Sequence, residues 1–231
     1  MRSGRGLSIG LAVAAVLCGT SCSDTPPAKV THPTPSVSVK EGGAGATAPV
    51  EQAHGRVVYL TFDDGPDPLW TPKVLAVLAK HAVHATFFML AQHANPHQEL
   101  VDEVRAAGHA IGNHSVSHPK LTKLSPAQLH HQVADGVHSR CFRPPYGATN
   151  PKVRAEIKRD GMQQVLWDVD TRDWSRPGVP VIVKRALAGA RPGAIILMHD
   201  GGGNRSETVA ALGQILTALS ARGYHFATLS C

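Results

Sequence analysis

Residues 57–66 read VVYLTFDDGP, an apolar run of strand length that stops at two adjacent carboxylates, Asp63 and Asp64. Asp, Gly and Pro favour turns, so this stretch alone indicates a strand followed by a turn. From Gly55 onward, short apolar runs alternate with amphipathic stretches. That alternation is typical of strands connected by helices, and it places the two aspartates at the end of the first strand.

The same reading, applied to the whole chain, predicts the fold. The strand candidates are Val57–Phe62, Ala85–Leu90, Ala110–Asn113, Arg140–Arg143, Gln164–Val169, Ala194–Met198 and His225–Leu229. The helix candidates lie near residues 71–81, 97–107, 125–135, 151–160, 179–190 and 206–222. Strands that alternate with helices pair in parallel, and short apolar strands suit a covered or closed sheet. We therefore predict an α/β fold, an irregular (β/α) barrel of about seven parallel strands.

The N-terminal segment has the features of an export signal. Two arginines precede an apolar stretch from Leu7 to Cys18, and small residues then lead to Cys22. The apolar stretch is too short and wrongly flanked for a membrane span. Small residues before a cysteine also resemble a bacterial lipoprotein signal, which would make Cys22 a lipidated residue. Gly19 stands where such signals usually carry leucine, so ordinary cleavage nearby is the alternative.

Composition divides the chain into three parts. The stretch after the signal is rich in Pro, Ser, Thr, Val, Gly and Ala and has no helical or strand period. We expect a signal peptide at residues 1–22, a flexible tether at 23–54 and a folded domain at 55–231. The protein would be exported to the cell envelope, where a lipid on Cys22 would be its contact with the membrane, or it would be secreted.

Charge and cysteine usage narrow the partners and the compartment. The formal net charge of +6 favours anionic surroundings, but Lys and Arg are scattered, and we expect no nucleic-acid partner. Cys18 would be removed with the signal. Cys141 and Cys231 then remain in an oxidising compartment, so we predict a disulfide between them; the alternative is two small buried thiols.

Reactive side chains follow the predicted strands. In (β/α) barrels the active site lies at the C-terminal ends of the strands. The side chains found there are Asp63 and Asp64, His114 and His118, Arg143 and Tyr146, Asp170, Asp173 and Trp174, and His199 and Asp200. A simple turn at Asp63-Asp64 does not predict ionisable groups at five strand ends, so we expect an active site there.

The spacing of two histidines indicates a divalent metal. His114 and His118 are four residues apart, so one helical turn or a compact loop brings both imidazoles to one side. No acidic residue lies between them to act as a base. The two aspartates supply what is missing: one completes a His/His/Asp ligand set, and the other can accept a proton from water.

Five motifs in order resemble those of a known family. TFDDGP, HSVSH, RPPYG, DTRDW and LMH resemble the polysaccharide deacetylases of carbohydrate esterase family four, over roughly residues 55–231. The resemblance implies metal-dependent hydrolysis of N-acetyl groups on an acetylated glycan, with release of acetate. Zinc is the usual metal, and another divalent cation such as Co²⁺ is the alternative.

The resemblance also implies residue roles. Asp64, His114 and His118 would bind the metal. Asp63 would be the general base, held by Arg143, and His199 the general acid, with Asp170 as its partner. The backbone N–H of Tyr146 would bind the oxyanion, and Trp174 and Leu197 would line the acetyl pocket. From the residues alone, the other histidines, His93 among them, are expected to be non-functional, and Asp173 and Asp200 are expected to cap or turn the chain.

Other functions compete with deacetylation of N-acetylglucosamine units in peptidoglycan or chitin-like oligomers. An acetylxylan esterase would use the same motifs on O-acetyl groups. A non-haem iron oxygenase shares a His/His/Asp set but has no use for a second carboxylate with an arginine. A glycoside hydrolase needs two carboxylates flanking one bond, which neighbouring residues on a strand do not provide. A non-catalytic glycan-binding module would tolerate loss of a motif, and none is lost.

The chain departs from the family between its second and third motifs. Only 24 residues separate His118 from Arg143, which leaves room for a short helix and little else. We expect a more open groove beside Tyr146 and therefore a substrate preference that the family resemblance does not fix.

Overall fold

The structure is a computed structural model that describes residues 55–231. The expected signal peptide, the lipidation of Cys22 and the tether at 23–54 therefore lie outside the described residues. Within residues 55–231, no helix is both long enough and apolar enough to cross a membrane.

The described strands form one parallel sheet, which confirms the predicted α/β fold. The main path runs β5-β4-β3-β2-β1-β7-β6, and β8 pairs with β1. The strands are β1 (Arg56–Asp63), β2 (Thr86–Met89), β3 (Ala110–Asn113), β4 (Cys141–Phe142), β5 (Gln163–Gln164), β6 (Val169–Asp170), β7 (Ile195–His199) and β8 (Tyr224–Phe226). β1 lies between β2 and β7 and also pairs with β8, and its residues from Leu60 to Asp63 are all buried.

The sheet must curl into an incomplete barrel. Its edge strands, β5 and β6, are joined by residues 165–168 alone. In a flat sheet those edges would be about 29 Å apart, whereas the connection spans at most about 18 Å. Val165 N–H donates to the carbonyl of Phe142 and Asp168 N–H to that of Ile195, so the connection bridges the two edges. The predicted irregular barrel is confirmed.

One predicted strand is two in the structure. We expected a single strand at 164–169, but its first residue belongs to β5 and its last to β6, at opposite edges of the sheet. Strands of two residues are too short to show a period in the sequence, so the apolar run gave no sign of the split.

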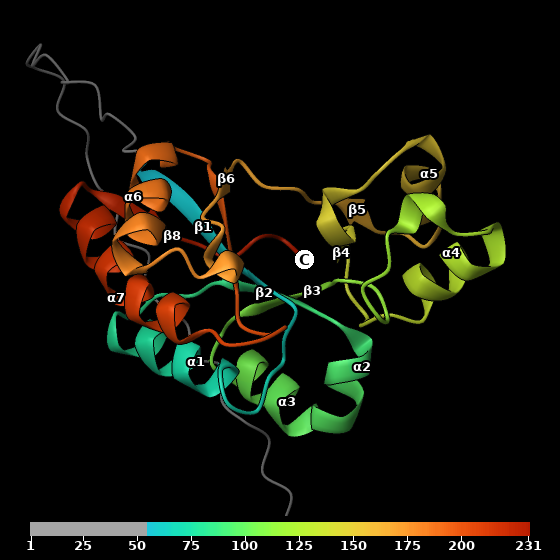
Figure 1. Ribbon diagram of the computed structural model, residues 1–231, viewed down its shortest axis with the longest axis horizontal. Coiled ribbons are helices and arrows are strands. Elements are labelled where there is room, and N and C mark those ends of the chain that lie inside the picture. The colour runs from blue at the N-terminus through green and yellow to red at the C-terminus, as the bar shows by residue number, and fades with distance from the viewer. Residues whose placement is uncertain (1–54) are drawn as a thin grey trace, which may run out of the picture. The chain divides into compact units, whose positions relative to one another are not determined.

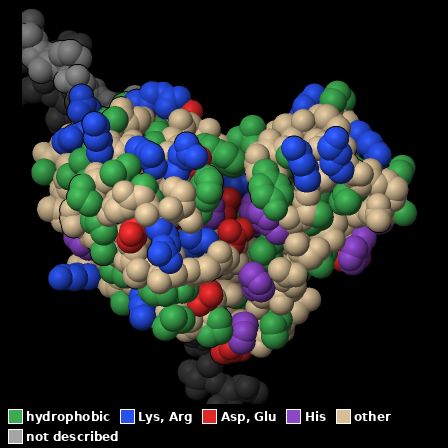
Figure 2. Space-filling model, viewed as in Figure 1, with side chains coloured by type: hydrophobic (Ala, Val, Ile, Leu, Met, Phe, Trp, Pro, Cys, Tyr) green, Lys and Arg blue, Asp and Glu red, His purple; other side chains and the backbone are tan. Residues whose placement is uncertain are grey.

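The helices pack outside the sheet in two groups (Figure 1). They are α1 (Thr71–Lys80), α2 (Ala91–Ala94), α3 (Gln98–Ala106), α4 (Pro126–Ala134), α5 (Pro151–Arg159), α6 (Val179–Gly189) and α7 (Ser206–Ala221). α1, α3, α6 and α7 cover the main core. α4 and α5 cover a second, smaller core around Phe142, and the surface is hollowed between the two groups (Figure 2).

Helix starts follow local chemistry. Ser125 caps α4 by accepting from Gln128 N–H, while the Gln128 side chain accepts from Ser125 N–H. Asn150 caps α5 by accepting from Val153 N–H, and a proline follows at the first helical position. The short helix α2 was not predicted, and it brings Gln92 and His93 to the end of β2.

A disulfide joins Cys141 on β4 to Cys231, with 4.9 Å between the two Cα atoms. It ties the C-terminal residue to the strand before Arg143. In the chain-entropy account, a crosslink over 90 residues stabilises the folded state by at most about 4 to 5 kcal/mol.

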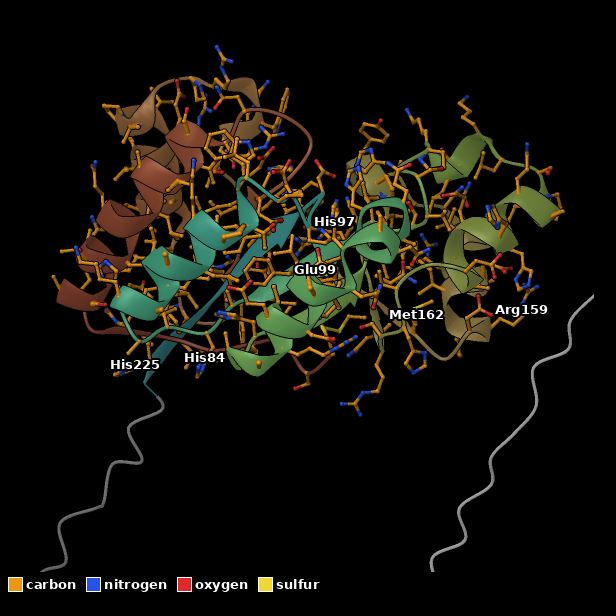
Figure 3. All side chains as sticks on the ribbon, turned by 90° about the horizontal axis from the view of Figure 1, so that it is seen from below. His84, His97, Glu99, Arg159, Met162 and His225 are labelled. Atoms are coloured by element: carbon orange, nitrogen blue, oxygen red, sulfur yellow. A yellow bond between two sulfur atoms is a disulfide. The ribbon has the colours of Figure 1, made fainter. Side chains whose placement is uncertain are left out.

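A buried histidine lies at the end of the sheet where the strands begin. His109 is 8% exposed, and its Nδ1 accepts a hydrogen bond of 3.1 Å from Ala85 N–H. The exposed His84, labelled in Figure 3, packs edge-on against it at 5.7 Å between ring centroids. Burial, with a smaller effect of charge on His84, lowers the pKa of His109 to about 4.

Acid should therefore destabilise the fold through His109. Its folded pKa lies below the unfolded value of about 6.5, so its contribution is complete above pH 6.5 and is lost as pH falls to 4. The loss should reach roughly 2 kcal/mol after allowance for solvent screening. In His109→Asn, Oδ1 can accept from Ala85 without titrating, so urea unfolding between pH 7 and 4 should show a weaker pH dependence. His138→Asn, at an exposed histidine, should keep the wild-type slope; equal slopes in all three proteins would contradict the assignment.

Candidate active site

The predicted site residues meet at the C-terminal ends of the strands. Asp63 ends β1 and His199 ends the neighbouring β7, where the two residues are register partners. They face a cleft of about 640 Å³, with acidic side chains and histidines at the floor of the hollow in Figure 2. Every residue predicted to act in catalysis, metal binding or substrate binding lines this cleft except Arg143, which lies buried behind Asp63.

Asp64, His114 and His118 form a set that can hold a metal. Asp64 Oδ1 lies 3.5 Å from His114 Nε2 and 3.4 Å from His118 Nε2. Ligands about 2.1 Å from a tetrahedral ion are about 3.4 Å apart, which matches this spacing. Asp64 Oδ1 is also buried and has no hydrogen-bond partner among residues 55–231. A buried carboxylate oxygen in that state fits a metal ligand.

The loop between the two histidines fixes the direction of both rings. His114 Nδ1 donates to the carbonyl of Arg143 at 2.7 Å, so its Nε2 is left free to face Asp64. Ser115 and His118 both adopt left-handed backbone conformations, with φ of 77° and 63°. Ser115 Oγ accepts from His118 N–H at 3.1 Å. The histidines are therefore joined by a compact loop, the second of the two arrangements expected from their spacing.

The charges around the set favour a cation. Burial opposes a charge on Asp64, but His114, His199 and His118 outweigh it and lower the pKa of Asp64 to about 2. Burial and the neighbouring His114 lower the pKa of His118 despite the nearby carboxylates. An ionised carboxylate beside a neutral imidazole is the protonation state that divalent metals require of their ligands.

Asp63 is held separately from Asp64. Arg143 is fully buried, and its Nη1 donates to Asp63 Oδ1 at 2.7 Å and to Thr61 Oγ1 at 2.8 Å. The other oxygen of Asp63 lies 3.6 Å from His114 Nε2. The arginine thus orients one carboxylate beside the metal set without taking part in the set itself.

One wall of the cleft offers an N–H group and apolar surface. Tyr146 adopts a left-handed conformation in the turn Pro145–Gly147, and its ring packs 4.5 Å from that of His118. Leu197 on β7 is buried at the cleft, whereas Trp174 and Tyr146 are 47% and 67% exposed. These positions suit an oxyanion donor and a lining for a small apolar group.

The carboxylate that holds His199 is Asp173, and the prediction of Asp170 in that position is wrong. Asp173 is 1% exposed, and its Oδ1 lies 2.8 Å from His199 Nδ1. Its Oδ2 accepts from His199 N–H at 2.9 Å and from Thr208 Oγ1 at 2.7 Å. Burial lowers the pKa of His199, but Asp173, then Asp63 and Asp64, outweigh it, so the pKa is raised. The ring therefore carries a proton more readily at neutral pH.

Asp173 rather than Asp170 reaches His199 because of a turn that the sequence pattern does not reveal. Asp170 ends β6 and accepts from Arg172 N–H at 2.8 Å, so its carboxylate is used in a local turn, although it still lines the cleft. Arg172 is left-handed, with φ of 52°, and the reversal brings Asp173 under His199. The family resemblance pointed to Asp170, but the backbone that follows selects Asp173.

Asp200 also has a larger role than a turn residue. It is fully buried, its Oδ2 accepts from Thr71 Oγ1 at 2.6 Å, and its N–H donates to the carbonyl of Asp63 at 3.1 Å. A Cβ at Gly65 would lie 2.4 Å from Asp200 Oδ2, so only glycine fits there. Burial, with Asp64 and Asp63 nearby, raises the pKa of Asp200 to about 7.

Further residues line the cleft without a sequence signal that assigns them a role, among them His93, Trp167 and Arg205. Arg205 donates to the carbonyls of Gly201 and Gly202 at 2.6 and 2.8 Å, which holds the glycine loop after β7. Their positions depend on segments of two to four residues that no sequence period describes.

A second group of potential ligands, His130, Glu156 and Asp160, lies on α4 and α5. Arg159, labelled in Figure 3, places its guanidinium on both His130 Nδ1 and Glu156 Oε1. The Arg159 guanidinium already pairs with two of these three side chains, so this group is a weaker candidate for a metal than the set in the cleft.

The chain is similar in sequence to known polysaccharide deacetylases. A family model described as polysaccharide deacetylase matches residues 51–165. The chain is 42% identical over 190 residues to a chitooligosaccharide deacetylase of Bradyrhizobium sp. (strain ANU 289), covering 73% of this chain and 87% of that protein. It is 42% identical over 185 residues to a peptidoglycan-N-acetylglucosamine deacetylase of Bacillus cereus, covering 76% and 87%. The chain belongs to the polysaccharide deacetylase family.

A solved structure shows the same fold. The peptidoglycan deacetylase PdaC from Bacillus subtilis superposes with a TM-score of 0.70 at 35% identity, over 77% of this chain and 89% of that one. Family membership makes the protein a hydrolase with a polysaccharide substrate, as the sequence predicted.

Replacing the partner of His199 should shift the pH dependence of the reaction. The charge on Asp173 raises the pKa of His199, so Asp173→Asn should lower it and move the alkaline limb of the rate profile by at least about 1 pH unit to lower pH. Asp170→Asn should leave that limb in place. Initial rates from pH 5 to 10 check this, and a shift in Asp170→Asn alone would restore the original assignment.

Proposed function

We propose that the protein removes N-acetyl groups from N-acetylglucosamine units of peptidoglycan or of chitin-like oligomers, with a divalent metal, and releases acetate. The observation that carries the proposal is the arrangement of Asp64, His114 and His118 next to a second carboxylate, with His199, held by Asp173, at the end of the neighbouring strand β7. Amide hydrolysis needs these parts: a base for water, a site for the oxyanion and an acid for the leaving amine.

Asp63 is the proposed general base. It lies at the cleft floor, and Arg143 keeps one of its oxygens fixed at 2.7 Å while the other faces the cleft. The guanidinium holds the carboxylate in place, so its second oxygen can take a proton from water without reorienting. Asp64 contributes a ligand instead, since it faces the two imidazoles.

His199 is the proposed general acid. Asp173 binds Nδ1, so Nε2 is the nitrogen that can reach the leaving amine in the cleft. The backbone N–H of Tyr146 stabilises the oxyanion, and Leu197 and Trp174 accommodate the acetyl methyl group. The metal, zinc or another divalent cation such as Co²⁺, supplies polarisation of the acetyl carbonyl and activation of water.

The choice of glycan rests on the open cleft and on the relatives. The exposed rings of Tyr146 and Trp174 flank the acetyl site and offer flat surface to a sugar. Relatives with 42% identity are named for peptidoglycan and for chitooligosaccharide, which share N-acetylglucosamine. Deacetylation of xylan, an O-acetyl reaction, is the second candidate, because hydrolysis of esters needs the same groups.

The proposed location is the outside of a bacterial membrane. The export signal at 1–22 supports secretion, Cys22 supports a lipid anchor, and the tether at 23–54 would let the domain at 55–231 reach wall glycan.

Acetate release tests the function. The zinc-loaded protein should release acetate from peptidoglycan and from chitotetraose, more slowly from acetylxylan, and not after treatment with a chelator. Readdition of zinc should restore the rate. No acetate from either N-acetylated glycan would overturn the proposal, and faster release from acetylxylan would favour the second candidate.

The adjacent aspartates should fail in different ways. Asp63→Asn leaves the ligand set intact and should keep zinc, yet lose about 10²- to 10⁴-fold in rate because the base is gone. Asp64→Asn should lose zinc affinity and recover part of its activity in excess zinc. Zinc stoichiometry after dialysis and initial rates distinguish the two. Equal loss of metal in both variants, or a near-native rate in Asp63→Asn, would contradict this division of roles.

A further inference from the structure

Three successive carbonyl oxygens after β1 are each held by a different donor. Asp200 N–H donates to the carbonyl of Asp63 at 3.1 Å, and Leu90 N–H donates to that of Gly65 at 3.0 Å. Between them, His93 Nδ1 lies 2.8 Å from the carbonyl of Asp64. Two of the donors are backbone groups that any residue would supply. His93 is the only side chain among the three.

His93 binds a peptide group whose backbone conformation is unfavourable. Asp64 has a left-handed φ of 74°, a conformation that costs a residue with a Cβ about 1 to 2 kcal/mol. The glycine loop after β7 packs directly on this peptide, because a Cβ at Gly201 would lie 2.2 Å from the Asp64 carbonyl oxygen. The orientation of this peptide decides where the Asp64 carboxylate points.

The proton on His93 is fixed by its partners. A carbonyl oxygen only accepts, so His93 Nδ1 must carry the hydrogen. His93 Nε2 lies 3.4 Å from the amide nitrogen of Gln92, which only donates. Both contacts are satisfied by one neutral tautomer. The ring, partly buried at the cleft wall, therefore needs no charge to support Asp64.

We propose that His93 is a positioning residue for the metal ligand Asp64. Its Nδ1–H holds the Asp64 peptide so that Oδ1 faces the Nε2 atoms of His114 and His118, 3.5 and 3.4 Å away. The inference rests on the proposed metal site. Groups that orient a ligand in this way typically contribute 10- to 100-fold to metal affinity.

Zinc affinity of the metal-free protein, measured by competition with a coloured chelator, tests the inference. His93→Phe keeps a ring but loses the donor and should bind zinc about 10- to 100-fold more weakly. His93→Asn should stay within about 3-fold of wild type, because Asn Nδ2 stands where His Nδ1 stands and can donate to the same carbonyl. His93→Gln, whose amide lies one atom further out, should resemble His93→Phe.

A matched control is available nearby. His97, labelled in Figure 3, lies in the next turn, and its Nδ1 contacts the Glu99 side chain rather than a metal-ligand residue. His97→Phe should bind zinc with wild-type affinity. Should His93→Phe fail to fold, the contrast between His93→Asn and His93→Gln carries the same test. A purely structural role would change thermal stability of the metal-free protein but not the order of zinc affinities.

The zinc affinities of the variants distinguish an error in the role of His93 from an error in the proposed metal ligands. Wild-type affinity in His93→Phe or His93→Gln, or equal weakening in His93→Asn, would overturn the role of His93 while His118→Ala still loses zinc. Full zinc binding by His118→Ala would instead overturn the proposed ligand set.

Discussion

The buried guanidinium of Arg143 is the contact on which the site depends. This side chain joins the end of β4 to two other parts of the barrel. Its Nη1 binds Thr61 and Asp63 on β1, and its Nη2 binds the carbonyl of Leu166 in the segment that bridges the sheet edges. The backbone carbonyl of Arg143 accepts from His114 Nδ1. Leaving such a charge unpaired would cost about 3 to 5 kcal/mol, so its partners are strongly constrained in position. One residue after a two-residue strand thus aligns Asp63, His114 and the bridging segment.

This constraint explains how two neighbouring carboxylates can have different environments. Asp63 is the last residue of β1 and is neutralised by Arg143, while the left-handed turn at Asp64 directs the next carboxylate to the imidazoles. The turn would be costly in isolation, and the donors from Asp200, His93 and Leu90 hold its carbonyls. Opposite, Asp173 supports His199 through both its ring and its backbone. The cleft therefore holds the proposed base, the proposed metal ligands and the proposed acid in fixed positions.

The sequence predicted what depends on local pattern and failed where distant contacts decide. Apolar runs that alternate with amphipathic stretches predicted the parallel barrel and its long helices, and strand ends predicted most of the residues that meet in the cleft. The split of residues 164–169 into β5 and β6 was missed, because two-residue strands have no period. Asp170 was chosen over Asp173 because only the left-handed Arg172 decides between them. The proposed role of His93 has no signal in the sequence, because its helix, α2, is four residues long and its partner is a backbone carbonyl.

A crystal structure of the zinc-loaded full chain, with anomalous scattering recorded at the zinc edge, would show whether Asp64, His114 and His118 hold the metal while Asp63 stays paired with Arg143. We expect one strong anomalous peak, bonded to Asp64 Oδ1 and to the Nε2 atoms of His114 and His118 at about 2.0 to 2.2 Å, with Asp63 still paired to Arg143. A peak bonded to Asp63 with Arg143 displaced, or a peak on the His130–Glu156 group with none in the cleft, would contradict it.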